Sequence, residues 1–116
     1  MRMISGLASS TLLAVVVLAG CGGGTADQAG EPDLTITIDG DQVAPVAQPL
    51  EALAGETIRI RIRSDRSGEL HVHAAPEQTV EFEAGTTTED VVVDTPGRVH
   101  IEEHASGVMV AEVSVR

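Results

Sequence analysis

Four histidines occur in the second half of this 116-residue chain, and their side chains are the best suited to chemistry. His71 and His73 are two residues apart, so on an extended strand their imidazoles lie on one face. His100 and His104 share a face of a later segment if its strand continues that far. Neutral imidazole binds Cu(II) and Zn(II), with an affinity that should fall below about pH 6. The pattern is consistent either with a metal site or with surface histidines on polar strand faces.

The only cysteine, Cys21, ends the sequence Leu18-Ala19-Gly20-Cys21. Arg2 and the apolar stretch 12–18 precede it, and that stretch is too short to remain as a membrane-spanning helix. The segment resembles the bacterial lipoprotein box (lipobox), in which cysteine becomes the first mature residue and receives a lipid such as palmitate. This resemblance implies a cleaved signal peptide over residues 1–20 and a lipid anchor on Cys21 at the extracytoplasmic face of the cell membrane. The folded part then has no thiol for redox chemistry, catalysis or metal binding.

Residues 22–33 are small and polar and lack apolar periodicity, which is typical of a flexible linker. We therefore expect the lipidated cysteine and linker over 21–33 and one domain over 34–116. The formal net charge is −11, and the chain contains one Phe and neither Tyr nor Trp. An acidic surface without aromatic platforms repels a phosphate backbone and cannot stack on bases, so nucleic-acid binding is excluded.

The domain consists of short segments with strand periodicity. Residues 57–63 are the clearest, since three isoleucines alternate with three arginines. We expect these arginines to pair with acidic residues such as Glu81 and Glu83 on an outer face; a patch for an anionic ligand is the alternative. The proline-interrupted stretch 43–50 fits an edge strand or a loop. Further strand-like segments, separated by turn residues, predict an all-β sandwich or small barrel at 34–38, 70–73, 80–83, 91–93, 99–101 and 108–115.

Two stretches of the domain resemble cupredoxins. Residues 50–58 look like the second strand region of that family. Pro96-Gly97, a strand over 98–102, a loop and the segment 109–115 resemble the closing hairpin of plastocyanin and amicyanin. The resemblance implies a single cupredoxin-like Greek-key β-sandwich. In that family the loop between the last two strands carries Cys, His and Met ligands of a blue copper, and an earlier strand supplies another His.

Carried over residue by residue, the resemblance puts His71 at the first histidine and Met109 at the axial methionine. Glu103 stands where the family has its cysteine, so blue-copper electron transfer is not expected without the thiolate. The same topology would bring His71 close to Glu103, His104 and Met109, with His73 on the face of His71. These five residues are the candidate metal ligands. Imidazole with a carboxylate suits Cu(II) or Zn(II) better than Cu(I), so copper or zinc is the candidate cofactor.

Motifs for catalysis are missing from the sequence. There is no Gly-x-Ser-x-Gly nucleophile elbow and no phosphate-binding loop motif, and Glu102 and Glu103 should face opposite sides of a strand. We therefore predict no catalytic residues. The sequence favours a membrane-anchored envelope lipoprotein that acts as a non-enzymatic binding or accessory module. The alternative is a copper- or zinc-binding module for buffering or delivery of the ion. The lipid anchor implies the membrane as a partner, and no protein partner is identified.

Overall fold

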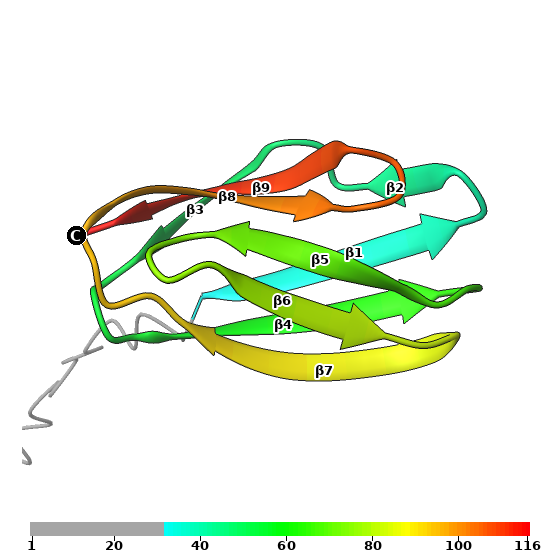
Figure 1. The fold of residues 1–116 in the computed structure, drawn as a ribbon, viewed down its shortest axis with the longest axis horizontal. Helices are drawn as coiled ribbons and strands as arrows, with labels where there is room; N and C mark the ends of the chain where they lie inside the picture. Colours follow the sequence, from blue (N-terminus) through cyan, green and yellow to red (C-terminus); the bar gives the residue numbers. More distant parts are fainter. Residues whose placement is uncertain (1–31) are drawn as a thin grey trace, which may run out of the picture.

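The computed structural model describes residues 32–116, which form nine β-strands (Figure 1). The predicted signal peptide, Cys21 and nearly all of the linker lie outside the described residues. Residues 32–116 include no helix that could span a lipid bilayer. The expected all-β architecture is confirmed by the strands β1 (Asp33–Asp39), β2 (Gln42–Ala44), β3 (Gln48–Ala52), β4 (Thr57–Ser64), β5 (Gly68–His73), β6 (Gln78–Phe82), β7 (Gly85–Val92), β8 (Gly97–Glu103) and β9 (Val108–Val115).

The strands form two sheets that pack into a sandwich (Figure 1). The four-stranded sheet has the order β2-β1-β4-β7, and the five-stranded sheet has the order β3-β9-β8-β5-β6. Two pairs, β1 with β4 and β3 with β9, are parallel, whereas the other pairs are antiparallel. A parallel pair needs a crossover connection. The chain provides it by passing from one sheet to the other between β2 and β3 and back again before β4.

The core between the sheets is built by strands whose apolar residues alternate with polar ones. The isoleucines of β4 are at most 1% exposed, and its arginines alternate with them toward the outer face. Arg59 binds Asp90 of β7 at 3.0 Å. The expected pairing with Glu81 and Glu83 was wrong for this arginine, because β4 lies between β1 and β7 while β6 belongs to the other sheet. Phe82 is the only aromatic side chain in an otherwise aliphatic core.

The proline-interrupted stretch forms β2 and β3, which are edge strands of different sheets, as its prolines indicated. β7 begins six residues earlier than expected, at Gly85 rather than Val91. Only Val91 is buried within β7, so its polar amino-terminal part has little apolar periodicity to reveal it. It is a strand because its backbone pairs with the full length of β4.

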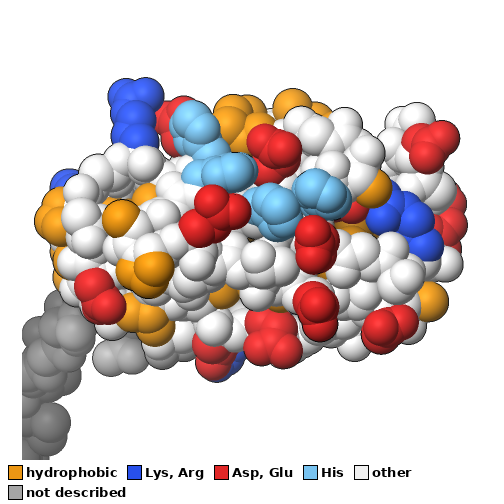
Figure 2. Space-filling model, viewed as in Figure 1, with side chains coloured by type: hydrophobic (Ala, Val, Ile, Leu, Met, Phe, Trp, Pro, Cys, Tyr) orange, Lys and Arg blue, Asp and Glu red, His pale blue; other side chains and the backbone are white. Residues whose placement is uncertain are grey.

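The outer face of the five-stranded sheet carries all four histidines. In the register of β5 and β8, His73 lies opposite His100 and His71 lies opposite Glu102. His104 follows directly after β8, in the turn that leads to β9. Figure 2 shows the histidines as a continuous pale-blue band with acidic side chains on both sides. We call these four residues the histidine row.

Candidate metal centre

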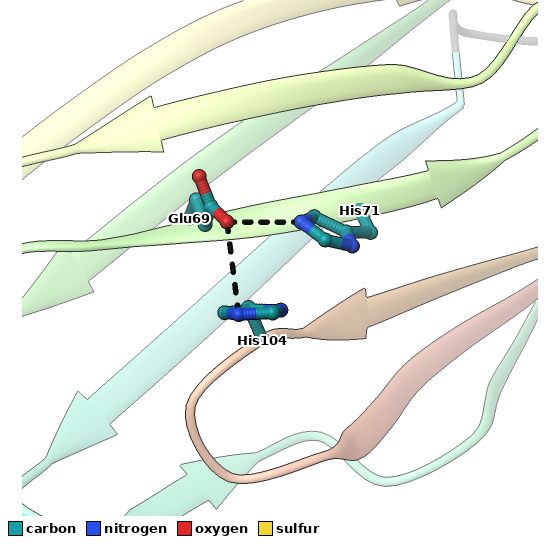
Figure 3. A group of neighbouring side chains, drawn as sticks. All are labelled: Glu69, His71 and His104. Carbon is teal, nitrogen blue, oxygen red and sulfur yellow. Dashed lines mark hydrogen bonds and ion pairs between the residues drawn. The ribbon is translucent and has the colours of Figure 1, made fainter.

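Glu69, His71 and His104 form a group of three potential metal ligands on this outer face (Figure 3). One oxygen of Glu69 and one nitrogen of each histidine all lie within 4.8 Å of one another. Glu69 Oε1 is 3.0 Å from His71 Nε2 and 3.9 Å from His104 Nε2. The two imidazole rings are tilted by 31° with their centroids 4.6 Å apart. The three side chains therefore converge on a single small volume.

The strand periodicity of β5 places two of these ligands side by side. Glu69 and His71 are alternate residues and share the outer face, while Leu70 and Val72 between and beside them are fully buried. A register slip of one residue would bury the polar pair, so the core fixes which side they occupy. The backbone amide of His104 donates a hydrogen bond to the carbonyl oxygen of Glu69 over 3.0 Å. This bond holds the third ligand residue beside β5.

The three side chains differ in how much solvent they contact. His71 is 22% exposed, Glu69 is 35% exposed and His104 is 61% exposed. His71 Nδ1 lies 3.8 Å from Glu77 Oε1, on the other side of its ring from Glu69. Histidines that bind metals usually have their second ring nitrogen next to a carboxylate or carbonyl, which fixes the tautomer and the ring orientation. His71 is thus the best-anchored ligand, and His104 is the most accessible one.

Glu103 faces the interior instead of joining this group. It follows Glu102 on β8, and neighbouring residues of a strand point to opposite faces. Its side chain is 0% exposed and accepts a hydrogen bond from Arg66 Nη1 at 3.1 Å. The backbone amides of Ala105 and Ser106 donate to its two oxygens at 3.3 and 2.8 Å. Among the described residues every buried polar side-chain atom, including these oxygens, has a hydrogen-bond partner.

Burial by itself would raise the pKa of Glu103, but the hydrogen bonds from Arg66, Ser106 and Ala105 outweigh it and lower that pKa to about 2. The hydrogen bond to Glu103 in turn raises the pKa of Arg66. Both groups are therefore charged at neutral pH. Because the buried carboxylate of Glu103 accepts hydrogen bonds from two amides of the turn after β8, it fixes the turn that carries His104.

The position of Glu103 also tests whether a blue-copper site fits this chain. The resemblance to cupredoxins placed Glu103 at the cysteine ligand, and Arg66 occupies one of its oxygens there. The guanidinium of Arg66 already neutralises this carboxylate, and residues 32–116 contain no thiolate. The residues do not fit a thiolate-bound copper. The group of Glu69, His71 and His104 is a different site, on the outer face of the sheet.

The predicted ligand His73 lies near the group without belonging to it. The ring of His73 is 6.1 Å from that of His71, and its Nε2 is 3.8 Å from Glu102 Oε2. Met109 is half-buried and lies opposite Glu102 in the register of β8 and β9. Of the five predicted residues, the structure thus brings together His71 and His104.

Sequence reasoning missed the carboxylate of the group, although a signal for it was present. The same two-residue spacing that places His71 beside His73 also places Glu69 beside His71. The strand was expected to start at Leu70, and this start left Glu69 out. β5 instead begins at Gly68.

Two imidazole nitrogens and one carboxylate oxygen make a suitable ligand set for Zn(II) or Cu(II). Metal–ligand bonds of 2.0–2.2 Å in a tetrahedral site place ligand atoms about 3.3 Å apart. The observed separations from Glu69, 3.0 and 3.9 Å, lie on either side of this value. Small side-chain rotations therefore suffice to bind an ion, with at least one coordination position left open.

Comparison with known proteins identifies the type of fold. No protein-family model matches the sequence, and a search of curated proteins found no match. Among solved structures, the reduced Cu(I) form of an amicyanin mutant has a TM-score of 0.53 and 12% identity, over 77% of this chain and 87% of that chain. A multicopper oxidase gives a TM-score of 0.54 and 13% identity, over 74% of this chain and 44% of that one. A blue copper oxidase from Nitrosomonas europaea gives a TM-score of 0.50 and 19% identity, over 72% of this chain and 43% of that chain. The described domain therefore has a cupredoxin-like fold.

Proposed function

We propose that this protein is a lipid-anchored envelope protein that binds Cu(II) or Zn(II) through Glu69, His71 and His104. Its role is to buffer the ion or deliver it to an acceptor, without catalysis. The observation that carries the proposal is the convergence of three ligand atoms within 4.8 Å on the outer face of the sandwich. This geometry favours a metal-binding module over an accessory module without a metal.

The ligand types support Cu(II) and Zn(II) over other ions. Imidazole with carboxylate is a common ligand set for both, whereas Cu(I) favours thiolate and thioether sulfur. The surroundings are also suitable for a cation, since Glu77 lies next to His71 and the chain carries a formal net charge of −11. A negative field raises the local concentration of cations and speeds their association.

The exposure of the site supports exchange of the ion rather than permanent storage. His104 is 61% exposed and belongs to a turn, so an acceptor ligand can approach the ion from its side. His71 is the more buried ligand and holds the ion while His104 is displaced. A site that is open in this way suits an ion carrier, since transfer requires a mixed intermediate with ligands from both proteins.

The sequence before the domain supports the location. Cys21 stands at the end of a lipobox-like segment, and about a dozen small and polar residues separate it from β1. A lipid on Cys21 would keep the domain at the extracytoplasmic face of the membrane. The linker would let the domain reach partners within a few tens of ångströms of its anchor.

Thermal unfolding in the presence of metal tests the proposal. The full chain should carry Cys21→Ser, so that the single thiol cannot bind the ion. Zn(II) or Cu(II) at about 100 times Kd should stabilise it by about 2.7 kcal/mol. His71→Gln should lose most of this stabilisation, while Glu81→Gln, which lies opposite Glu69 on β6, should keep it. An unfolding temperature that does not respond to either metal would leave only the accessory module.

A further inference from the structure

We infer that the histidine row holds a second Cu(II) or Zn(II) ion, bound by His73, His100 and Glu102, beside the ion at Glu69, His71 and His104. The inference rests on the proposed function, because both ions would belong to one ion-binding face. It adds a second ion-binding position next to the first.

The register of the sheet brings the second set of ligands together. His73 on β5 lies directly opposite His100 on β8. Side chains directly opposite one another in antiparallel strands have Cβ atoms about 5 Å apart. Glu102 is two residues from His100 on the same strand and face, and its Oε2 lies 3.8 Å from His73 Nε2. Two imidazoles and a carboxylate are therefore neighbours here too.

These side chains are free to rotate onto an ion. The side chains of His73, His100 and Glu102 are 43%, 49% and 39% exposed, whereas a core residue would be fixed by its packing. In the present arrangement the ring nitrogens of His73 and His100 face different carboxylates, Glu102 and Glu112. The second position therefore forms when the ion draws the side chains together, while the first is largely preformed.

Glu112 gives His100 the kind of support that Glu77 gives His71. Its Oε2 lies 3.3 Å from His100 Nε2, and Arg98 Nη1 binds its other oxygen at 3.1 Å. A carboxylate on one ring nitrogen fixes the ring and leaves Nδ1 as the ligand atom. Arg98 in turn holds Glu112 in place, so Glu102 rather than Glu112 is the carboxylate that binds the ion.

The charge of the face permits two ions. Two divalent ions on neighbouring positions repel each other, and the second therefore binds more weakly than the first. The carboxylates of Glu69, Glu77, Glu102 and Glu112 lie along the row and offset this repulsion, while Arg98 is the cation that pairs with one of them. Figure 2 shows acidic side chains, in red, on both sides of the pale-blue histidine band.

Counting bound zinc tests the inference. The full chain with Cys21→Ser is dialysed against Zn(II) and its metal content is measured, together with the variants His100→Gln and His104→Gln. Both histidines are exposed, so circular dichroism without metal should show unchanged folding. We expect two zinc ions in the parent chain, one in each variant and none in the double variant. In NMR spectra the imidazole signals of His71 and His104 should shift with the first equivalent, and those of His73 and His100 with the second.

The outcomes separate this inference from the proposed function. One ion that is lost in His104→Gln and kept in His100→Gln would overturn the second position and leave the proposed function intact. One ion that is lost only in His100→Gln would overturn the proposed centre and support the position at His73 and His100. A parent chain that binds no zinc would overturn both.

Discussion

The backbone amide of His104 donates a hydrogen bond to the carbonyl oxygen of Glu69 over 3.0 Å. This bond continues the pairing of β5 and β8 by one residue beyond β8 and brings a turn residue next to two strand residues. On the buried side of the same turn, Glu103 binds Arg66 and two turn amides. The turn that carries His104 is therefore held by the buried carboxylate of Glu103, which faces away from the candidate centre.

The carboxylate of Glu69 should determine much of the metal affinity. Its Oε1 lies within 4 Å of a nitrogen of both His71 and His104, so we expect Glu69→Gln to weaken Zn(II) binding at least tenfold. Isothermal titration calorimetry measures this change. Glu81→Gln is the matched control, because it removes one exposed charge from the opposing position on β6. Equal effects of the two substitutions would mean that only the general negative charge matters.

The ion pair of Arg66 and Glu103 should contribute strongly to stability. Arg66→Met leaves a fully buried carboxylate without its cation, and we expect the free energy of unfolding to fall by roughly 3–5 kcal/mol. Urea denaturation measures the loss. Arg116→Met removes an exposed pair with Glu51 and should cost less than about 1 kcal/mol. Similar losses in both variants would show that burial does not strengthen the Arg66 pair.

Acid should destabilise the domain through Glu103. Its pKa falls from 4.5 to about 2 on folding. A folded-state pKa below the unfolded value stabilises the fold above about pH 4.5, and the stabilisation disappears as the pH falls toward 2. At 1.36 kcal/mol per pKa unit the full effect is about 3 kcal/mol.

Unfolding free energies measured between pH 2 and 6, with a chelator present to remove metal ions, should show this dependence on pH. Glu103→Gln should flatten it, and an unchanged slope in that variant would assign the acid sensitivity to other groups.

Local periodicity predicted much of the fold. The isoleucines of β4 and the alternation in β1 mark buried faces, and both strands occur where expected. The amino-terminal half of β7 was missed because it is held by backbone pairing with β4 and has almost no buried side chains. The parallel pairs could not be derived from periodicity, since an alternating pattern is the same for either strand direction.

Part of the candidate metal site was also predicted from the sequence. His71 and His104 were identified because imidazole is a strong indicator of metal chemistry. The alternation of side chains along a strand places Glu69 on the same face as His71 and puts Glu103 on the buried face. This alternation applies to Glu69 only because β5 begins at Gly68, and the sequence did not reveal that start. The partner of Glu103 is Arg66, 37 residues earlier in the chain, and such a contact depends on the tertiary fold alone.

Gly68 should not tolerate a side chain. An added Cβ would lie 2.6 Å from Phe82 Cζ and 3.0 Å from Arg66 Nη1. Phe82 is 3% exposed and cannot move aside freely, so Gly68→Ala should destabilise the domain by about 1–3 kcal/mol in urea denaturation. Phe82→Leu makes room for the methyl group. The double variant should therefore lose less than the sum of the single losses, and strict additivity would rule out this contact as the cause.

Membrane attachment should depend on Cys21. Cys21→Ser removes the atom that would carry the lipid, so the protein should appear in the medium or stay unprocessed with its signal peptide. Fractionation of producing cells, followed by mass measurement of the chain, distinguishes these two results. Ser106→Ala is a control that leaves the anchor unchanged. Membrane retention of a processed Cys21→Ser chain would contradict the lipid anchor.

The most direct test of the metal centre is a crystal structure with zinc, with anomalous scattering data collected at the zinc edge. We predict an anomalous peak about 2.0–2.2 Å from one Glu69 oxygen and from one nitrogen each of His71 and His104. A peak only at other residues, or no peak on this face at saturating zinc, would contradict the proposal that these three residues bind the ion.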